Sequence, residues 1–478
     1  MLLASSLGGV LWSSGCDVQF LVVGRQVADA AADAGAADAD LSDAASDGGA
    51  SDAGAGDAEV VPADADVDAG PCRLCLDPGF ASQAPLVIDG RGAASTDFSP
   101  QAIAVQADDR ILVGGTLSTD AGLQWFVVRL TEAGAYDPGF GTGGQATIDV
   151  GSQPSPVVES LAVEQTSGSI LVAGARGPDD AIVGLVARLS PTGSLDTSFG
   201  TQGLTIIDRA PGDDVVNGMV VLADGRIRLG GHCWPASTST SNSDLCLWGL
   251  TRAGATDPTF QGGSHRAVDL GGADEFNGSL VAASGGALLV PAVSWVGTQF
   301  EAALLKVDEA GHNAGFGQVS FALSGESDCT SIVEQADGHI LGAGSAKPGG
   351  SETDFAAFRL LANGTLDPSF ASAGKLVVDL GGQDSAAAVV VLGDGRIVLG
   401  GTATQAGHGD TDLALLTVLP DGSPDPTVGR AGRLYFDVSS GQNDRLHALV
   451  VDPHGRLVVF GSTAHGSGND IVVLRLIP

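Results

Sequence analysis

The stretch KLVVDLGGQDSAAAVVVLGDGRIVLGGTATQ, residues 375–405, shows the pattern that decides the fold. Short apolar runs alternate with turn residues, and the GDG at 393–395 between two such runs is a strong hairpin signal. The pattern continues to residue 419, where PDGS turns the chain into another unit. It predicts a meander of four short strands, at 375–379, 386–392, 396–399 and 412–419.

The same unit recurs along the chain. A turn signature of the form Asp-Pro-x-Phe, strict in some units and looser in others, returns at intervals of 54 to 61 residues. Its copies begin at Asp77, Asp137, Asp196, Asp257, Asn313, Asp367 and Asp425. A second signature, clearest as Asp-Gly-Arg-Ile at 394–397, lies near the middle of each unit. A fixed period of this length is typical of repeat architectures.

The apolar runs are nearly continuous rather than alternating, which is typical of a sheet covered on both faces. One four-stranded sheet cannot cover both of its own faces, whereas sheets packed around an axis cover one another. We therefore predict an all-β fold over residues 72–478, a seven-bladed β-propeller of four-stranded antiparallel blades. An open β-solenoid and a ring of six or eight blades are the alternatives. An offset of one strand between the unit and the blade is a further alternative, and Pro291 is expected to interrupt its strand.

Two signatures in register resemble the delta-60 repeat family. The resemblance is carried by Leu366-Asp-Pro-Ser-Phe370, Asp379, the DGRIVLG at 394–400 and the DLAL at 412–415, and it extends over residues 76–478. It implies a β-propeller of the kind found in bacterial surface and secreted proteins. It implies no shared enzymatic activity.

The first 71 residues differ from the rest of the chain. An apolar stretch, Leu2–Trp12, leads through small residues to Cys16, which resembles the end of a bacterial lipoprotein signal peptide and implies that Cys16 is lipidated. Residues 1–16 contain no Lys or Arg, and Ser13 stands where that family usually has Leu. An apolar N-terminus packed on the domain is the alternative. We predict a signal peptide at 1–16.

Residues 17–71 contain 13 acidic residues and one basic residue, with no apolar stripe at helical spacing. This composition is typical of a disordered, extended acidic linker. A solvated Ala-rich helix is the alternative.

The overall charge restricts the partners. There are 22 Lys and Arg against 57 Asp and Glu, a formal charge of −35. Nucleic acid and anionic lipid surfaces require a basic face and are therefore not expected as partners. No apolar run reaches the ~20 residues of a membrane-spanning helix. We expect a monomer that contacts the membrane only through its lipid anchor, with no cofactor.

Five cysteines remain beside Cys16, and export would permit disulfides. Cys233 and Cys246 flank a long polar loop at the two ends of one hairpin, so we predict that they pair. Cys72 and Cys75 are predicted to form a second, small disulfide, with a redox pair or half a zinc site as the alternatives. Cys329 is expected to be buried and reduced.

Two sets of aspartates recur with the repeats. Those of the turn signature are interpreted as structural caps of their own turns; they are Asp77, Asp137, Asp196, Asp257, Asp367 and Asp425. A second set lies in polar loops ahead of the last predicted strand of a unit and comprises Asp244, Asp354, Asp412 and Asp470. These could hold Ca²⁺, but capping is the favoured interpretation, and we predict no metal site. No catalytic residue is assigned.

These features favour a non-enzymatic, lipid-anchored binding or scaffold module of the bacterial cell envelope, periplasmic or on the outer surface. Its ligand is expected to be a protein or a glycan. The alternatives are a polysaccharide hydrolase or lyase with its site at the channel mouth of the propeller, and Ca²⁺-dependent adhesion.

Overall fold

The fold is known from a computed structural model. It describes residues 73–88, 98–119, 122–151, 155–178, 181–208, 212–234, 243–270, 280–349, 352–405, 409–465 and 468–478. The predicted signal peptide, the predicted linker, Cys16 and Cys72 lie outside the described residues.

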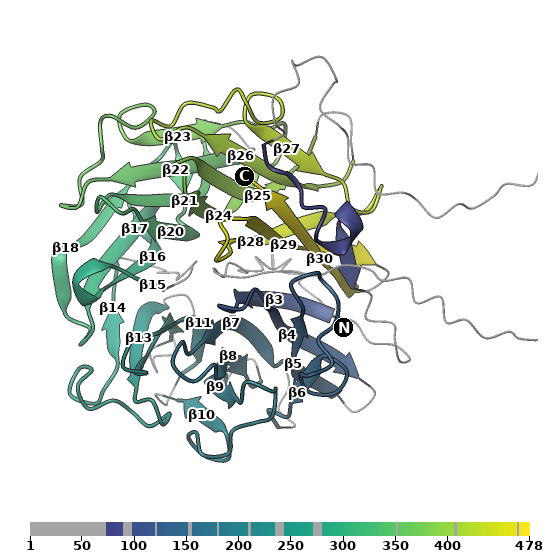
Figure 1. Cartoon of the computed structure of the whole chain (residues 1–478). Helices are drawn as coiled ribbons and strands as arrows, with labels where there is room; N and C mark the ends of the chain where they lie inside the picture. The colour runs from purple at the N-terminus through teal and green to yellow at the C-terminus, as the bar shows by residue number, and fades with distance from the viewer. Residues whose placement is uncertain are drawn as a thin grey trace, which may run out of the picture.

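The strands form seven antiparallel blades around a central axis (Figure 1), which confirms the predicted seven-bladed β-propeller. The first strands of neighbouring blades contact one another, so they are the innermost strands of the ring. Blade 1 contains β3 (Phe98–Val105), β4 (Ile111–Thr119), β5 (Gly122–Leu130) and β6 (Gln145–Ile148). Blade 2 contains β7 (Val157–Val163), β8 (Ile170–Arg176), β9 (Val183–Leu189) and β10 (Leu204–Ile207).

Blades 3 to 5 follow the same order. Blade 3 contains β11 (Asp214–Val221), β12 (Ile227–Cys233), β13 (Asp244–Leu250) and β14 (Arg266–Val268). Blade 4 contains β15 (Val281–Ala282), β16 (Ala287–Val296), β17 (Gln299–Asp308) and β18 (Asn313–Phe321). Blade 5 contains β20 (Ser331–Glu334), β21 (Ile340–Lys347), β22 (Asp354–Leu360) and β23 (Lys375–Val378), with β19 (Glu326–Ser327) also paired to β21.

Blade 6 contains β24 (Ser385–Val391), β25 (Ile397–Ala403), β26 (Asp412–Val418) and β27 (Arg433–Phe436). Blade 7 contains β28 (Asp444–Val451), β29 (Leu457–His465) and β30 (Gly468–Ile477). Two 3₁₀ turns, η1 (Ala81–Gln83) and η3 (Ser284–Gly286), are also present. In the part of the chain that the structure describes, no helix is long and apolar enough to cross a bilayer.

The ring closes by joining the two ends of the described chain. The outer strand of blade 7 is β2 (Leu86–Ile88), which pairs antiparallel with β30 through Leu86 and Val473 and through Ile88 and Ile471. The shorter β1 (Cys75–Leu76) extends the same ladder toward Ile477. The repeat unit is therefore offset by one strand from the blade, because each Asp-Pro turn precedes the last strand of its blade.

The innermost strands share a bulge that explains a recurring glycine. Five of them shift register against the second strand of their blade, as between Ala386 and Ala388 in β24. The bulge brings the Ser385 carbonyl over Gly401, where a Cβ atom would lie 2.0 Å from that oxygen. The same holds for Gly174 beneath the Val157 carbonyl. Only glycine fits beneath the bulge without displacing backbone.

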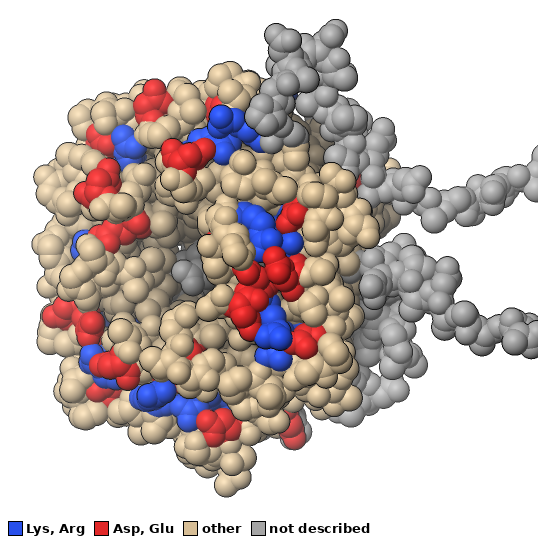
Figure 2. Space-filling model, viewed as in Figure 1, with Lys and Arg blue, Asp and Glu red and all other residues tan. Residues whose placement is uncertain are grey.

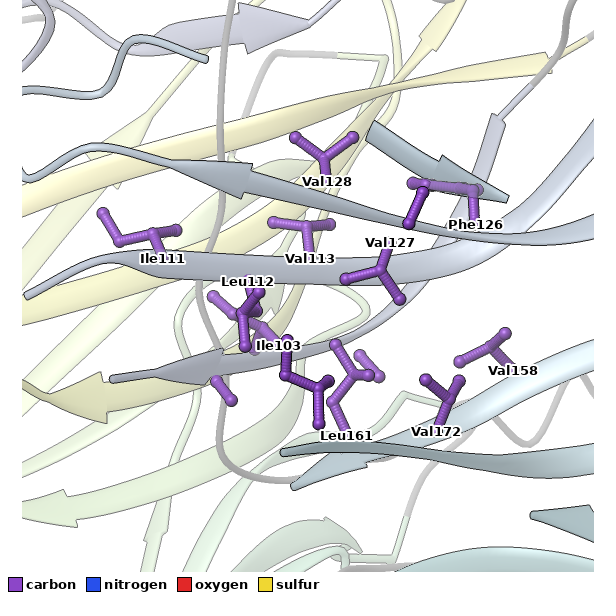
Figure 3. Packing of buried hydrophobic residues seen from close by; sticks show 14 of the residues in the cluster. Ile103, Ile111, Leu112, Val113, Phe126, Val127, Val128, Val158, Leu161 and Val172 are labelled. Atoms are coloured by element: carbon purple, nitrogen blue, oxygen red, sulfur yellow. The ribbon is translucent and has the colours of Figure 1, made fainter. Parts of the chain in front are cut away.

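The core lies between the blades rather than inside one sheet. Figure 3 shows side chains of blade 1 such as Leu112 and Val127 pointing toward Leu161 and Val172 of blade 2. These residues are 0–2% exposed. Covering both faces of each sheet in this way explains the continuous apolar runs of the sequence.

Blade 4 is the least regular sector. The prediction that Pro291 interrupts its strand is wrong, because Pro291 lies within β16 and opposes Leu304 of β17. The ladder from β15 ends at Leu289, so beyond this point β16 is paired to β17 alone among the described strands. Residues 313–316, which stand in place of the Asp-Pro turn, belong to β18.

Candidate functional site

The turn aspartates cap their own turns. In each of the six turns, Oδ1 of the aspartate accepts a hydrogen bond of 2.8–3.0 Å from the backbone N–H two residues later. The capped residues are Gly79, Gly139, Ser198, Thr259, Ser369 and Thr427. Five of these turns end in a buried phenylalanine, such as Phe140 and Phe370 at 0% exposure, and the sixth ends in the buried Val428. The turn aspartates therefore have a structural role, and their carboxylates are already hydrogen-bonded within the turn.

Sequence reasoning missed the arginines that complete these turns. Nε of Arg129 donates to Oδ2 of Asp137 at 2.8 Å, and the guanidinium lies over the Phe140 ring. The same trio recurs in three other blades, as Arg188–Asp196–Phe199, Arg359–Asp367–Phe370 and Arg475–Asp77–Phe80. We call this trio the Arg–Asp–Phe joint. Three of the four share a spacing of eight residues between Arg and Asp, a signal present in the sequence.

Each joint reaches across to the next blade. Nη1 of Arg188 donates to the Arg252 carbonyl at 2.6 Å, and Nη1 of Arg475 donates to the Glu132 carbonyl at 2.6 Å. Blade 3 uses Arg228 from its second strand to reach Asp257. Figure 2 shows acidic and basic groups side by side at intervals around one face of the ring. The joints therefore lock neighbouring blades together.

The two ends of the blades differ in the connections they carry. Because strands alternate in direction, the turns between first and second strands and between third and fourth strands lie at one end. The connections between second and third strands and those between blades lie at the other end, which we call the loop face. A binding site on a propeller built from several blades would draw on such loops.

Two of the four aspartates of the second set join acidic clusters on the loop face. Asp354 meets Asp379 and Asp384 in the blade-5/6 cluster. Asp412 meets Asp437 and Asp444 in the blade-6/7 cluster. In each cluster one carboxylate oxygen from each residue lies within 4.8 Å of the others. Asp244 begins β13 and Asp470 lies in β30; positions 271–279 and 89–97, in the connections that follow their blades, lie outside the described residues.

Both clusters are assembled by the same backbone contacts. The N–H of Asp384 donates to the Thr353 carbonyl at 2.8 Å, next to Asp354. The N–H of Asp444 donates to the Thr411 carbonyl at 2.7 Å, next to Asp412. These bonds tie the connection between two blades to the third strand of the preceding one, and so bring the three carboxylates together.

The inner aspartate of each cluster also closes its own connection. Oδ2 of Asp384 accepts the N–H of Leu380 at 2.5 Å, and Oδ2 of Asp444 accepts the N–H of Val438 at 2.6 Å. Capping in these loops is thus performed by Asp384 and Asp444. No backbone N–H donates to Asp354 in the described part of the chain.

Burial and mutual repulsion act on these carboxylates. Asp384 and Asp444 are both 0% exposed. Burial raises the pKa of Asp384 to about 6, and the charge of Asp379 contributes to the rise. Burial likewise raises the pKa of Asp444 to about 7, with a contribution from Asp437. A rise of this kind marks carboxylates that lack a compensating positive charge.

A third group, Asp109, Glu132 and His454, differs from these clusters because it is neutralised. Arg456 pairs with Asp109 at 3.3 Å and with Glu132 at 2.9 Å, and it also binds Asp452 and Asp77. Nε2 of His454 lies 2.8 Å from Oδ2 of Asp109. This network joins blade 7 to blade 1.

The loop face also bears an exposed aromatic hairpin in blade 4. Trp295 near the end of β16 opposes Phe300 of β17, and their rings meet edge to face at 4.6 Å. The indole N–H donates to the Gly297 carbonyl at 3.1 Å. Trp295 remains 37% exposed and Val296 45% exposed. The result is a rigid apolar platform with its polar atom satisfied.

Between blades 6 and 7 the same face is hollowed. A hollow of about 360 Å³ is lined by Gly409, Asp410, Gly441, Gln442, Asn443 and Ala464. Three of these residues, Gly441, Gln442 and Asn443, directly precede Asp444 along the chain. The hollow is therefore a polar recess beside the blade-6/7 cluster.

The structure also places the cysteines. Cys233 and Cys246, predicted to pair, form a disulfide between β12 and β13 with a Cα–Cα distance of 5.8 Å. Cys75 is disulfide-bonded, and its predicted partner Cys72 lies outside the described residues. Cys329 is free of disulfides and buried.

Four segments of the chain match the family model of a domain of unknown function (DUF5122) beta-propeller, at residues 106–140, 165–199, 335–370 and 392–427. Each segment runs from the first turn of a blade to its Asp-Pro turn, in blades 1, 2, 5 and 6. The protein is a propeller-repeat protein. No curated protein matches the sequence of this propeller-repeat protein.

Comparison of the propeller-repeat protein with solved structures found matches of low similarity. A protein of unknown function from Dyadobacter fermentans is 12% identical, covers 67% of this chain and 93% of its own, and has a TM-score of 0.39. An α-L-arabinofuranosidase from Fusarium graminearum is 11% identical, with coverages of 82% and 96% and a TM-score of 0.40. An α-L-arabinanase from Penicillium chrysogenum is 14% identical, with coverages of 65% and 90% and a TM-score of 0.37.

Proposed function

We propose that this protein is a non-enzymatic binding module of the cell envelope whose loop face binds a glycan. The observation that carries the proposal is the Trp295–Phe300 hairpin. An exposed indole suits the apolar face of a sugar ring, and its N–H is already bonded within the hairpin. Because Trp295 is held by its cross-strand partner, little conformational freedom is lost when a ligand stacks on it.

The propeller supports this role by holding its loops rigidly. Blade 4 presents the hairpin on two ten-residue strands, β16 and β17, which pair along their whole length. Polar groups for hydrogen bonding lie on the same face, in the hollow beside Asn443. A few aromatic groups together with placed polar groups are typical of ligand sites.

We further propose that the module is lipidated at Cys16, tethered by residues 17–71 and built from delta-60 repeats. The apolar stretch before Cys16 and the acidic composition after it support the anchor and the tether. Labelling cells with a radioactive fatty acid should mark the full chain and should fail to mark Cys16→Ser. Equal labelling of the two chains would refute the anchor without bearing on the glycan.

The binding proposal is tested with the purified chain on an array of envelope and extracellular polysaccharides. We expect reversible binding, with the affinity lowered about 10-fold or more in Trp295→Ala. An aromatic side chain that becomes buried when the ligand binds dominates such contacts. Leu123→Ala is the matched control, since Leu123 is 43% exposed beside the β4–β5 connection of the same face. It should bind as the parent does.

Two outcomes would overturn the proposal. Release of cleaved sugars would favour the polysaccharide hydrolase or lyase instead. Capture of a protein with no glycan bound would make the ligand a protein.

A further inference from the structure

We propose that the blade-5/6 cluster and the blade-6/7 cluster each bind one Ca²⁺ ion, which joins the two blades on either side. The inference concerns a metal site and is independent of the proposed glycan ligand. It rests on the donor geometry and on buried oxygens without hydrogen bonds in both clusters, and on the absence of a counter-charge among the described residues at the blade-5/6 cluster.

The donor spacing fits one shared ion. Ca²⁺ binds oxygen ligands at about 2.3–2.6 Å, so two oxygens on the same ion lie at most about 5 Å apart. The ligand atoms of Asp354, Asp379 and Asp384 all lie within 4.8 Å of one another. The same limit holds for Asp412, Asp437 and Asp444. Each cluster therefore offers three carboxylates to one point.

A second observation points to a missing ligand. Oδ1 of Asp384 and Oδ1 of Asp444 are buried and have no hydrogen-bond partner among the described residues. The other oxygen of each carboxylate is bound to a backbone N–H. A buried polar atom without a partner is costly, and a cation would satisfy it.

Among the described residues, no protein cation balances the blade-5/6 cluster. Across the described ranges, no Lys or Arg nitrogen lies within 4.0 Å of a carboxylate oxygen of Asp354, Asp379 or Asp384. By contrast, the acidic group around Asp109 contains Arg456. Three carboxylates brought together by backbone bonds repel one another unless protons or a metal ion neutralise them.

The donor set selects the class of ion. All six side chains are carboxylates, with no thiol or imidazole among them. Hard oxygen donors suit Ca²⁺ and Mg²⁺ rather than zinc or copper. Ca²⁺ accepts irregular sites completed by carbonyls and water, whereas Mg²⁺ requires a near-octahedral set. Loop-built clusters between two blades therefore favour Ca²⁺.

The ring contains a related junction that lacks the carboxylate of the third strand. Between blades 2 and 3, Asp208 follows β10 and Asp214 begins β11, and the N–H of Asp214 donates to the Ile182 carbonyl. The residue after Ile182 is Val183, where blades 5 and 6 have Asp354 and Asp412. The carboxylate of the neighbouring Asp213 accepts the Ile182 N–H at 2.8 Å, so we expect no ion there.

The experiment titrates Ca²⁺ into the full chain after chelation and dialysis into metal-free buffer, with calorimetry as the readout. Asp379→Asn and Asp437→Asn each remove one carboxylate from a position that is not fully buried, so both variants should fold. Each is expected to lower the number of bound Ca²⁺ ions by one relative to the parent, and the double variant by two. Asp208→Asn is the matched control and should leave the number unchanged.

A second readout is the Tm of the parent with and without Ca²⁺. Ca²⁺ should raise it, because a ligand of the native state stabilises that state. The same concentration of Mg²⁺ should raise it less. The proposal is overturned if the parent binds no Ca²⁺, or if the two variants retain the full number of ions.

Discussion

Arg475, three residues from the end of the chain, donates from Nε to Oδ2 of Asp77 at 2.7 Å, across 398 residues of sequence. Both side chains are buried, at 2% and 8% exposure. Its Nη1 also reaches the Glu132 carbonyl of blade 1. One guanidinium thus joins the C-terminal strand, the N-terminal segment and the next blade at the point where the ring closes.

Replacing Arg475 with Ala should be strongly destabilising. Breaking a buried ion pair costs about 3–5 kcal/mol, because it leaves the buried Asp77 with only the longer 3.8 Å contact to Arg456 as a counter-charge. Arg188→Ala is the control, since its pair with Asp196 is more exposed at 12% and 28%. Urea unfolding of both variants should show the smaller loss of unfolding free energy for Arg188→Ala. Equal losses would contradict a special role for the closing joint.

Removing the N-terminal strand should open the ring. A chain that lacks residues 1–88 loses β1 and β2 and exposes the edge of β30 at Ile471–Val473. An unpaired apolar edge is a template for association. Light scattering after size exclusion should show oligomers for this chain and a monomer for a chain lacking only residues 1–70. A monomeric species for both would refute the closure.

Acid should weaken the joint of blade 5 over a defined range. Burial would raise the pKa of Asp367, but hydrogen bonds from Ser369 and Arg359 outweigh it and lower the pKa to about 2. The folded pKa is below the unfolded value of 3.8, so the stabilisation is present above about pH 4 and is lost as the pH falls toward 2. The stabilisation of the folded state by the ionised Asp367 amounts to about 2 kcal/mol.

The measurement compares the parent with Asp367→Asn by urea unfolding between pH 6 and pH 2. The difference in unfolding free energy between the two chains should shrink through this range, because the variant has no carboxyl group to protonate. A difference that stays constant down to pH 2 would show that the carboxylate is not held by the joint.

Replacement by alanine should affect the stability strongly at one glycine of blade 6 and weakly at another. A Cβ atom at Gly401 would lie 2.0 Å from the Ser385 carbonyl oxygen and 2.8 Å from the Phe355 ring, so Gly401→Ala should cost about 1–3 kcal/mol or more. Gly393 has no atom within 4 Å of that position, and Gly393→Ala should change the stability by less than about 1 kcal/mol. Thermal unfolding distinguishes the two, and equal shifts would contradict the bulge.

The sequence was sufficient for the fold because the repeat and its apolar runs are local features. The sequence left an offset of one strand open and could not decide it, since β2 pairs with β30 only through ring closure. The arginine of the joint was accessible in principle, because Arg129 and Asp137 share their spacing with Arg359 and Asp367. It was missed because each of these arginines stands near the end of an apolar strand, where an ordinary exposed charged residue is also expected.

The acidic clusters show a different limit. Asp379 follows Asp354 by 25 residues, and Asp437 follows Asp412 by the same interval. That recurrence is visible in the sequence, but the third carboxylate comes from the next blade, at Asp384 or Asp444. Only the packing of one blade on another brings the three together, so the sequence alone supports no more than the capping interpretation of Asp354 and Asp412.

The closure through β2 sets an order of events for biosynthesis. Residues 86–88 leave the ribosome long before their partners at 471–473 are made. While the intervening blades are synthesised, the nascent chain therefore holds a strand with no place to dock. The ring can close only after residues 471–473 have been made, and any factor that shields the waiting strand until then would determine how much of the product folds.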